Sequence, residues 1–145
     1  MATEDTHLVV VGTDGSEEAE RAVSFAADEA ERRGASVRVV TAWHVPSAVY
    51  GGGYAPMVTP SVEESTRNAA EGVAQRAADR LRANGLEVET KVCHGQAADA
   101  LLEEAKDADL LVVGSRGHGG FVGLLLGSVS QQCAHHASCP TAIVR

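Results

Sequence analysis

Basic residues are scarce in this chain of 145 residues. Its 12 Lys and Arg stand against 20 Asp and Glu, so the formal net charge is −8 at pH 7. Binding to DNA, RNA or an anionic membrane surface depends on clustered Lys and Arg, which displace counterions from phosphates. No such cluster occurs in the sequence. We therefore expect neither nucleic acid nor a membrane as a partner.

Long hydrophobic runs are also absent. The most apolar stretch, residues 121–127, is far shorter than the roughly 18 residues of a membrane-spanning helix. The N-terminal residues 1–6 include Glu4 and Asp5 but no basic residue, unlike the start of a secretory signal. The three cysteines are odd in number and have no repeated spacing, which favours a reducing compartment. Together these features predict a cytoplasmic protein.

The rest of the composition is that of a folded domain. Hydrophobic residues make up 44% of the chain and charged residues 22%, which is outside the range typical of disordered proteins. A chain of this length buries roughly 68% of its unfolded surface, enough for one core. Because no internal repeat or linker occurs, we predict a single domain over residues 1–145.

Short β-branched runs alternate with longer stretches of helical spacing. The predicted helices are one from the cap Ser16 to Arg33, one opened by a capping box of Ser61 and Glu64, one around residues 97–105, and one over residues 128–137. The predicted strands are residues 8–11, 37–43, 88–93, 110–113 and 141–144. This alternation indicates an open, doubly wound parallel sheet, which binds ligands beyond the carboxyl ends of its strands.

Two segments follow strands at that edge. The first is residues 12–16, and the second is residues 114–128, which holds six of the fifteen glycines. Glycine lets backbone N–H groups approach an anion closely and curl around phosphate oxygens. We interpret the second segment as a phosphate-binding loop, the alternative being a flexible turn. A third segment, residues 44–60, contains consecutive glycines beginning at Gly51 and ends at Pro60. We interpret it as a lid, a binding loop or a disordered stretch.

Ser128 opens the helix that follows the glycine-rich segment. Free N–H groups and the positive end of the helix dipole attract negative charge there. Ser128 would also serve as an ordinary helix cap, because Gln131 three residues later completes a capping box. The two roles are compatible.

The spacing Gly114-x2-Gly117-x9-Gly127-Ser128 resembles the ATP-binding signature of the universal stress protein family. The resemblance covers the whole chain, from VVVGTDGSEEAERAV to the ending GSVSQQCAHHASCPTAIVR. It implies a flavodoxin-like α/β fold with five parallel strands in the order 3-2-1-4-5 and helices on both faces. It also implies a homodimer, with ATP held between the ends of the first and fourth strands.

The resemblance also implies a set of binding residues. Asp14 matches an acidic residue near the ribose, the phosphates or their metal, and Ala42 matches the position whose backbone contacts adenine. Gly127, Ser128 and the amide of Val129 match the group that holds the terminal phosphates. The full set of predicted ATP-binding residues is Thr13, Asp14, Ala42, Gly114, Arg116, Gly117, Gly127, Ser128 and Val129.

Three of the polar candidates have a second interpretation. Asp14 would supply the hard oxygen ligand that Mg²⁺ prefers alongside nucleotide phosphates, or would act as a turn residue. Arg116 and His118 would place positive charge near the phosphates, or would point to water. We interpret Cys133, His135, His136 and Cys139 as an accident of spacing, because four ligands from one helical turn and its exit would not converge tetrahedrally.

Signatures of an enzyme are mostly absent. The chain has no G-x-S-x-G elbow, and Gly12 stands where a phosphoaspartate phosphatase would need a second Asp. We therefore predict an ATP-binding regulator, with a cyclic AMP-binding protein or a slow ATP hydrolase as alternatives. The terminal strand, Thr141 to Val144, has only Arg145 as a nearby charge, and this poorly protected edge predicts a two-fold dimer built around it.

Overall fold

The computed structural model describes residues 6–45, 60–117 and 126–145. The described strands form one parallel sheet in the order β3-β2-β1-β4-β5. This confirms the predicted flavodoxin-like sheet. The strands are β1 (Leu8–Gly12), β2 (Ser36–Trp43), β3 (Val88–His94), β4 (Leu110–Gly114) and β5 (Thr141–Val144), and the helices are α1 (Glu17–Arg33), α3 (Pro60–Ala83), α4 (Ala97–Glu104) and α5 (Ser128–His136).

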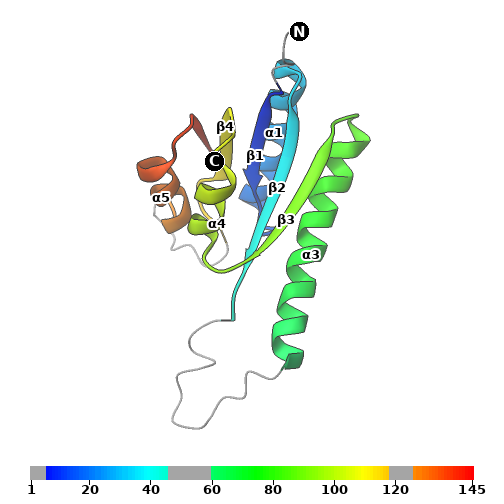
Figure 1. The fold of residues 1–145 in the computed structure, drawn as a ribbon, viewed down its shortest axis with the longest axis vertical. Coiled ribbons are helices and arrows are strands. Elements are labelled where there is room, and N and C mark those ends of the chain that lie inside the picture. Colours follow the sequence, from blue (N-terminus) through cyan, green and yellow to red (C-terminus); the bar gives the residue numbers. More distant parts are fainter. Residues whose placement is uncertain (1–5, 46–59, 118–125) are drawn as a thin grey trace.

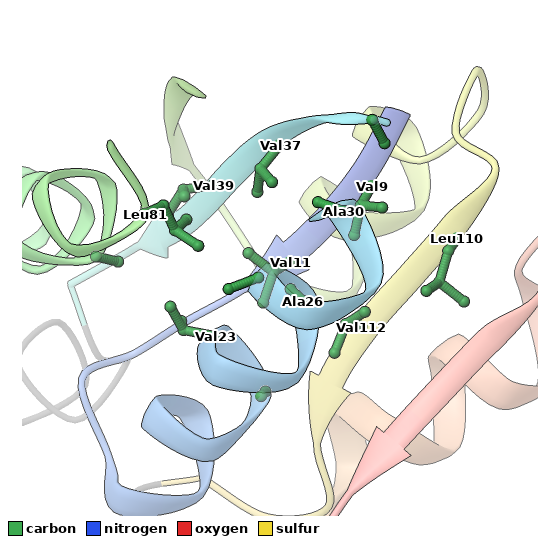
Figure 2. Packing of buried hydrophobic residues seen from close by; sticks show 14 of the residues in the cluster. Val9, Val11, Val23, Ala26, Ala30, Val37, Val39, Leu81, Leu110 and Val112 are labelled. Atoms are coloured by element: carbon green, nitrogen blue, oxygen red, sulfur yellow. The ribbon is translucent and has the colours of Figure 1, made fainter. Parts of the chain in front are cut away.

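Helices cover both faces of the sheet. On one face, α1 and α3 pack over alternate strand residues, and Figure 2 shows Val9, Val11 and Val112 pointing toward α1. On the other face, α4 and α5 pack over the residues between them, including Val10 and Val113. Figure 1 shows α3 beside β3, and α4 beside α5. Burial on both faces explains the unbroken apolar runs of β1 and β4, because no residue of a central parallel strand faces water.

Helix α1 begins and ends as the sequence predicts. The Ser16 hydroxyl accepts a hydrogen bond from the amide of Ala19, and Gly34 ends the helix in the left-handed conformation (φ 63°). Its inner face consists mainly of alanines, which let the helix lie close to the sheet. They are Ala19, Ala22, Ala26, Ala27 and Ala30.

One helix start and one helix cap differ from the prediction. Helix α3 begins at Pro60, one residue before the expected cap Ser61; proline suits the first turn because that turn needs no N–H donor. Helix α5 begins at Ser128 as predicted, but its cap is Gly127, so the capping box of Ser128 with Gln131 is wrong. The Gln131 amide instead donates to the carbonyl of Leu126 (3.4 Å).

The cysteine–histidine segment is split between core and surface. Cys133 is completely buried under the sheet, whereas His135 and His136 on the same helix are exposed. All three cysteines are free thiols, and burial raises the pKa of Cys133 to about 11. Within residues 6–45, 60–117 and 126–145, no helix has the length and hydropathy to cross a bilayer.

Candidate functional site

A cleft of about 330 Å³ lies at the carboxyl ends of β1 and β4. This volume is at the lower end of the range for small-ligand pockets. All nine residues of the predicted ATP-binding set line this cleft. They are Thr13, Asp14, Ala42, Gly114, Arg116, Gly117, Gly127, Ser128 and Val129. His118 and the glycines at 119, 120 and 123 lie outside the described residues. Their predicted roles stay predictions.

The wall after β1 is fixed by Thr13. Its amide donates to the carbonyl of Val40 (3.0 Å), and its carbonyl accepts a hydrogen bond from the Thr41 hydroxyl (3.0 Å). Its own hydroxyl accepts from the amide of Gly15, which has a positive φ of 82°. This buried residue therefore shapes the turn, and Asp14 follows it at the exposed rim of the cleft.

Asp14 takes part in the turn while facing the glycine-rich segment. Its Oδ1 accepts a hydrogen bond from the amide of Ser16 (2.9 Å), as in an Asx turn. A Cβ atom on Gly117 would lie 2.5 Å from its Oδ2. The turn interpretation of Asp14 is therefore observed, and the same carboxylate also lies directly beside the segment after β4. Only a glycine allows this approach without displacing the carboxylate.

The connection from β4 to α5 is closed at its base by buried hydrogen bonds. The carbonyl of Ser115 accepts from the amide of Gly127 (2.6 Å), and the Ser130 hydroxyl lies 2.8 Å from the same carbonyl. Ser130 also lies 3.0 Å from the carbonyl of Gly127. These bonds hold the first and last residues of the connection together. They also aim the start of α5 at the cleft.

Glu18 is a residue that the sequence analysis missed. One carboxylate oxygen accepts from the Ser115 hydroxyl (2.7 Å) and the Arg116 amide (2.6 Å), and the other accepts from the Arg116 guanidinium (2.9 and 3.1 Å). The hydrogen bond from Ser115, together with those from Arg116, lowers the pKa of Glu18 against the opposing effect of burial. An acidic residue in the first turn of α1 was visible in the sequence. Its partners 97 and 98 residues away were not.

The cleft combines polar and apolar surfaces. Val40, Ala42, Ala97 and Leu101 form an apolar part, which suits a flat heterocycle. The amides of Ser128 and Val129 open α5, where backbone N–H groups have no partner within the helix. Beside Ala42, the indole of Trp43 stacks on His94 with the ring centroids 4.4 Å apart.

Comparison with known proteins agrees with this arrangement. The family model described as Universal stress protein family matches residues 6–145. A universal stress protein of Mycolicibacterium smegmatis is 41% identical, over 100% of this chain and 48% of the relative. The chain spans about half the length of the mycobacterial relatives that it matches.

Two solved structures add information on ligands. A universal stress protein in complex with cAMP is 33% identical with a TM-score of 0.70, covering 96% of this chain and 97% of that one. A universal stress protein from Archaeoglobus fulgidus in complex with dAMP is 26% identical with a TM-score of 0.69, covering 99% of this chain and 100% of that one.

Proposed function

This chain belongs to the universal stress protein family, and from that premise we propose that its cleft binds an adenine nucleotide, ATP in particular, as a regulatory ligand. The observation that carries the proposal is the convergence of the nine predicted residues, from three separate segments of the chain, on one cleft. The similar proteins bound to cAMP and dAMP support an adenine nucleotide as the ligand class.

The two parts of the cleft suit the two ends of such a ligand. The adenine ring would lie against the apolar part near Ala42, and the phosphates would accept hydrogen bonds from the amides of Ser128 and Val129. A Cβ atom at Gly114, Gly117 or Gly127 would meet Glu18, Asp14 or Arg116 respectively, so glycine lets the segments at the phosphate end lie close together. Mg²⁺ would be held by Asp14 together with the phosphates, because this carboxylate supplies the hard oxygen that the ion prefers. The ion would neutralise part of the phosphate charge.

Regulation rather than catalysis fits this cleft better. Hydrolysis of ATP needs a group that orients water and another that stabilises charge in the transition state. Among the described lining residues, Arg116 is the candidate for the second role, and its guanidinium is held by Glu18. We propose that bound nucleotide changes the shape or the partners of a cytoplasmic homodimer, joined through Thr141–Val144.

Cyclic AMP is a second candidate ligand. The 33% identical relative bound to cAMP favours it, as does the small net charge of a cyclic monophosphate in a cleft with an acidic rim. In this alternative the same residues would hold a single phosphate, and the outer part of the glycine-rich segment would stay without a ligand.

Calorimetric titration with ATP, AMP and cyclic AMP, each with and without Mg²⁺, tests the proposal. Preference for ATP over AMP in Mg²⁺ would support recognition of the outer phosphates, whereas displacement of ATP by cyclic AMP would favour the second candidate. Gly127→Val is the control, because a Cβ atom there would lie 3.3 Å from the Arg116 backbone and would push apart the two segments that line the phosphate end. Equal binding by this variant and the wild type would contradict the site.

A further inference from the structure

The carboxylate of Glu18 binds the guanidinium of Arg116, the cationic side chain that lines the phosphate end of the cleft. Glu18 lies in the first turn of α1, and its side chain is 13% exposed. It accepts four hydrogen bonds, one from the Ser115 hydroxyl and three from the amide and guanidinium of Arg116. The contact therefore joins the start of α1 to the segment after β4, and both contribute residues to the cleft lining.

This contact changes the charge that a ligand meets. Among the lining residues that the structure describes, Arg116 is the cation. Its guanidinium pairs with the carboxylate of Glu18 at 2.9 Å, so Arg116 brings little net positive charge to the phosphates. Backbone amides and the helix dipole then supply the attraction for phosphate, and these are partial charges only.

Resting on the proposed function, we propose that Glu18 sets the phosphate-charge specificity of the cleft by positioning residues 115–116 and withholding the charge of Arg116 from the ligand. A nucleotide with several phosphates then needs a divalent cation to bind well, whereas a monophosphate or a cyclic monophosphate binds without one. Glu18 is a positioning residue in this scheme, because it acts through Arg116 and Ser115 rather than on the ligand.

The low pKa of Glu18 agrees with this role. The hydrogen bond from Ser115, followed by those from Arg116, stabilises the ionised form, so the carboxylate is charged at neutral pH. The neutralisation of Arg116 is therefore present under the conditions in which nucleotides are bound.

The test compares Glu18→Gln with Glu17→Gln, its exposed neighbour in the same helical turn. Both variants remove one negative charge from the chain, but only the first releases Arg116. The measured quantity is the dissociation constant of AMP divided by that of ATP, both determined in EDTA. A higher ratio means that ATP is bound more tightly relative to AMP. A unit charge within about 10 Å of the phosphates acts inside one Debye length at 0.1 M salt. We expect the ratio to rise about tenfold in Glu18→Gln and to change by less than about twofold in Glu17→Gln.

Variants of Arg116 extend the test, and Arg116→Gln keeps the proposal falsifiable if Glu18→Gln does not fold. Arg116→Gln alone should lower the ratio about tenfold, because Glu18 is then unpaired, and Glu18→Gln combined with Arg116→Gln should return it to the wild-type value. If Arg116 contacted phosphate directly and Glu18 were only a structural anchor, the double variant would keep the low ratio. Circular dichroism and thermal melting report folding in each case.

The outcomes separate this inference from the proposed function. Failure of the wild-type protein to bind any adenine nucleotide would overturn both. Binding by the wild type together with an unchanged ratio in Glu18→Gln, or a low ratio in the double variant, would overturn only the role of Glu18.

Discussion

The amide of Ser115 donates a 2.7 Å hydrogen bond to the carbonyl of Val144. This bond joins the first residue of the glycine-rich connection to the last residue of the edge strand β5. Ser115 is buried and also contacts Glu18, Gly127 and Ser130. The cleft and the edge of the sheet therefore share one residue, so a ligand that displaces Ser115 also moves the end of β5.

We expect the protein to be a dimer of twice its 15.0 kDa mass, joined through β5. The carbonyls of Pro140 and Val144 accept hydrogen bonds from Leu111 in β4 and from Ser115 directly after it, so by alternation the N–H of Ile143 faces the open edge. Ile143→Pro removes this donor and should give a monomer, as measured by size exclusion with light scattering. Ile143→Ala loses a similar side chain but keeps the N–H, and should stay dimeric. A monomeric wild type at micromolar concentration would contradict the dimer.

Ser130→Ala should lower the free energy of unfolding by about 1 kcal/mol. The variant removes the hydroxyl that bonds the carbonyls at both ends of the glycine-rich connection. Urea unfolding measures the loss, and amide hydrogen exchange at Gly127 should become faster. Ser138→Ala, at an exposed position after the same helix, is the control and should stay within about 0.5 kcal/mol of the wild type.

Gly114→Ala should destabilise the fold by about 1–3 kcal/mol. A Cβ atom at Gly114 would lie 3.1 Å from the backbone of Glu18 and 3.2 Å from that of Ala19, and a helix backbone does not yield locally. Gly72→Ala is a control of opposite sign. Gly72 lies inside α3, where a new Cβ meets only the end of the Arg76 side chain, and alanine favours the helix by up to about 1 kcal/mol. Thermal melting of both variants measures the contrast.

Arg38→Met should lower the free energy of unfolding by about 2 kcal/mol at neutral pH. The side chain of Arg38 is 15% exposed and donates to Glu89, to Asp107 and to the carbonyl of Glu104. Arg32→Met, at a position whose side chain is 68% exposed, is the matched control and should have little effect.

The effect of Arg38→Met should depend on pH. The hydrogen bond from Arg38 lowers the pKa of Asp107 below its ordinary value of 3.8. A lowered folded-state pKa stabilises the protein above the unfolded value and loses that contribution as the pH falls through the folded value. The difference between wild type and variant should therefore be largest above pH 4 and shrink below it. A difference that is constant down to pH 2 would contradict an ionic contribution.

The fold was predictable because local pattern and global burial agree. Val9, Val10 and Val11 form an unbroken apolar run, and each is completely buried between two helical layers. The cap Ser16 and the left-handed Gly34 likewise depend only on neighbouring residues. The start of α5 at Ser128 was also predictable, but the capping box suggested by Ser128 and Gln131 is not formed, because Gly127 is the cap and its amide donates to the carbonyl of Ser115.

The sequence predicted nine of the residues that line the cleft but not the pairing of its charges. Glycines at fixed spacing predict that the backbone approaches a bound anion closely, and the segments that contain these glycines line one cleft. The pairing of Arg116 with Glu18 depends on how α1 lies against the end of β4, and no local pattern encodes it. Side-chain electrostatics therefore required the structure, as did the lining residues outside the predicted set, such as Leu101 and Ser115.

Trp43 offers a fluorescence probe next to the cleft. It is the single tryptophan of the chain, it follows Ala42 at the cleft wall, and its indole already rests on His94. Neighbouring side chains of a strand point to opposite faces, so we expect a ligand against Ala42 to act on this fluorophore through the backbone of β2 and to shift its emission. Tryptophan emission from the unlabelled protein would then report the fraction of protein with bound ligand over time. It would give the association and dissociation rates of the ligand, which an equilibrium titration does not measure.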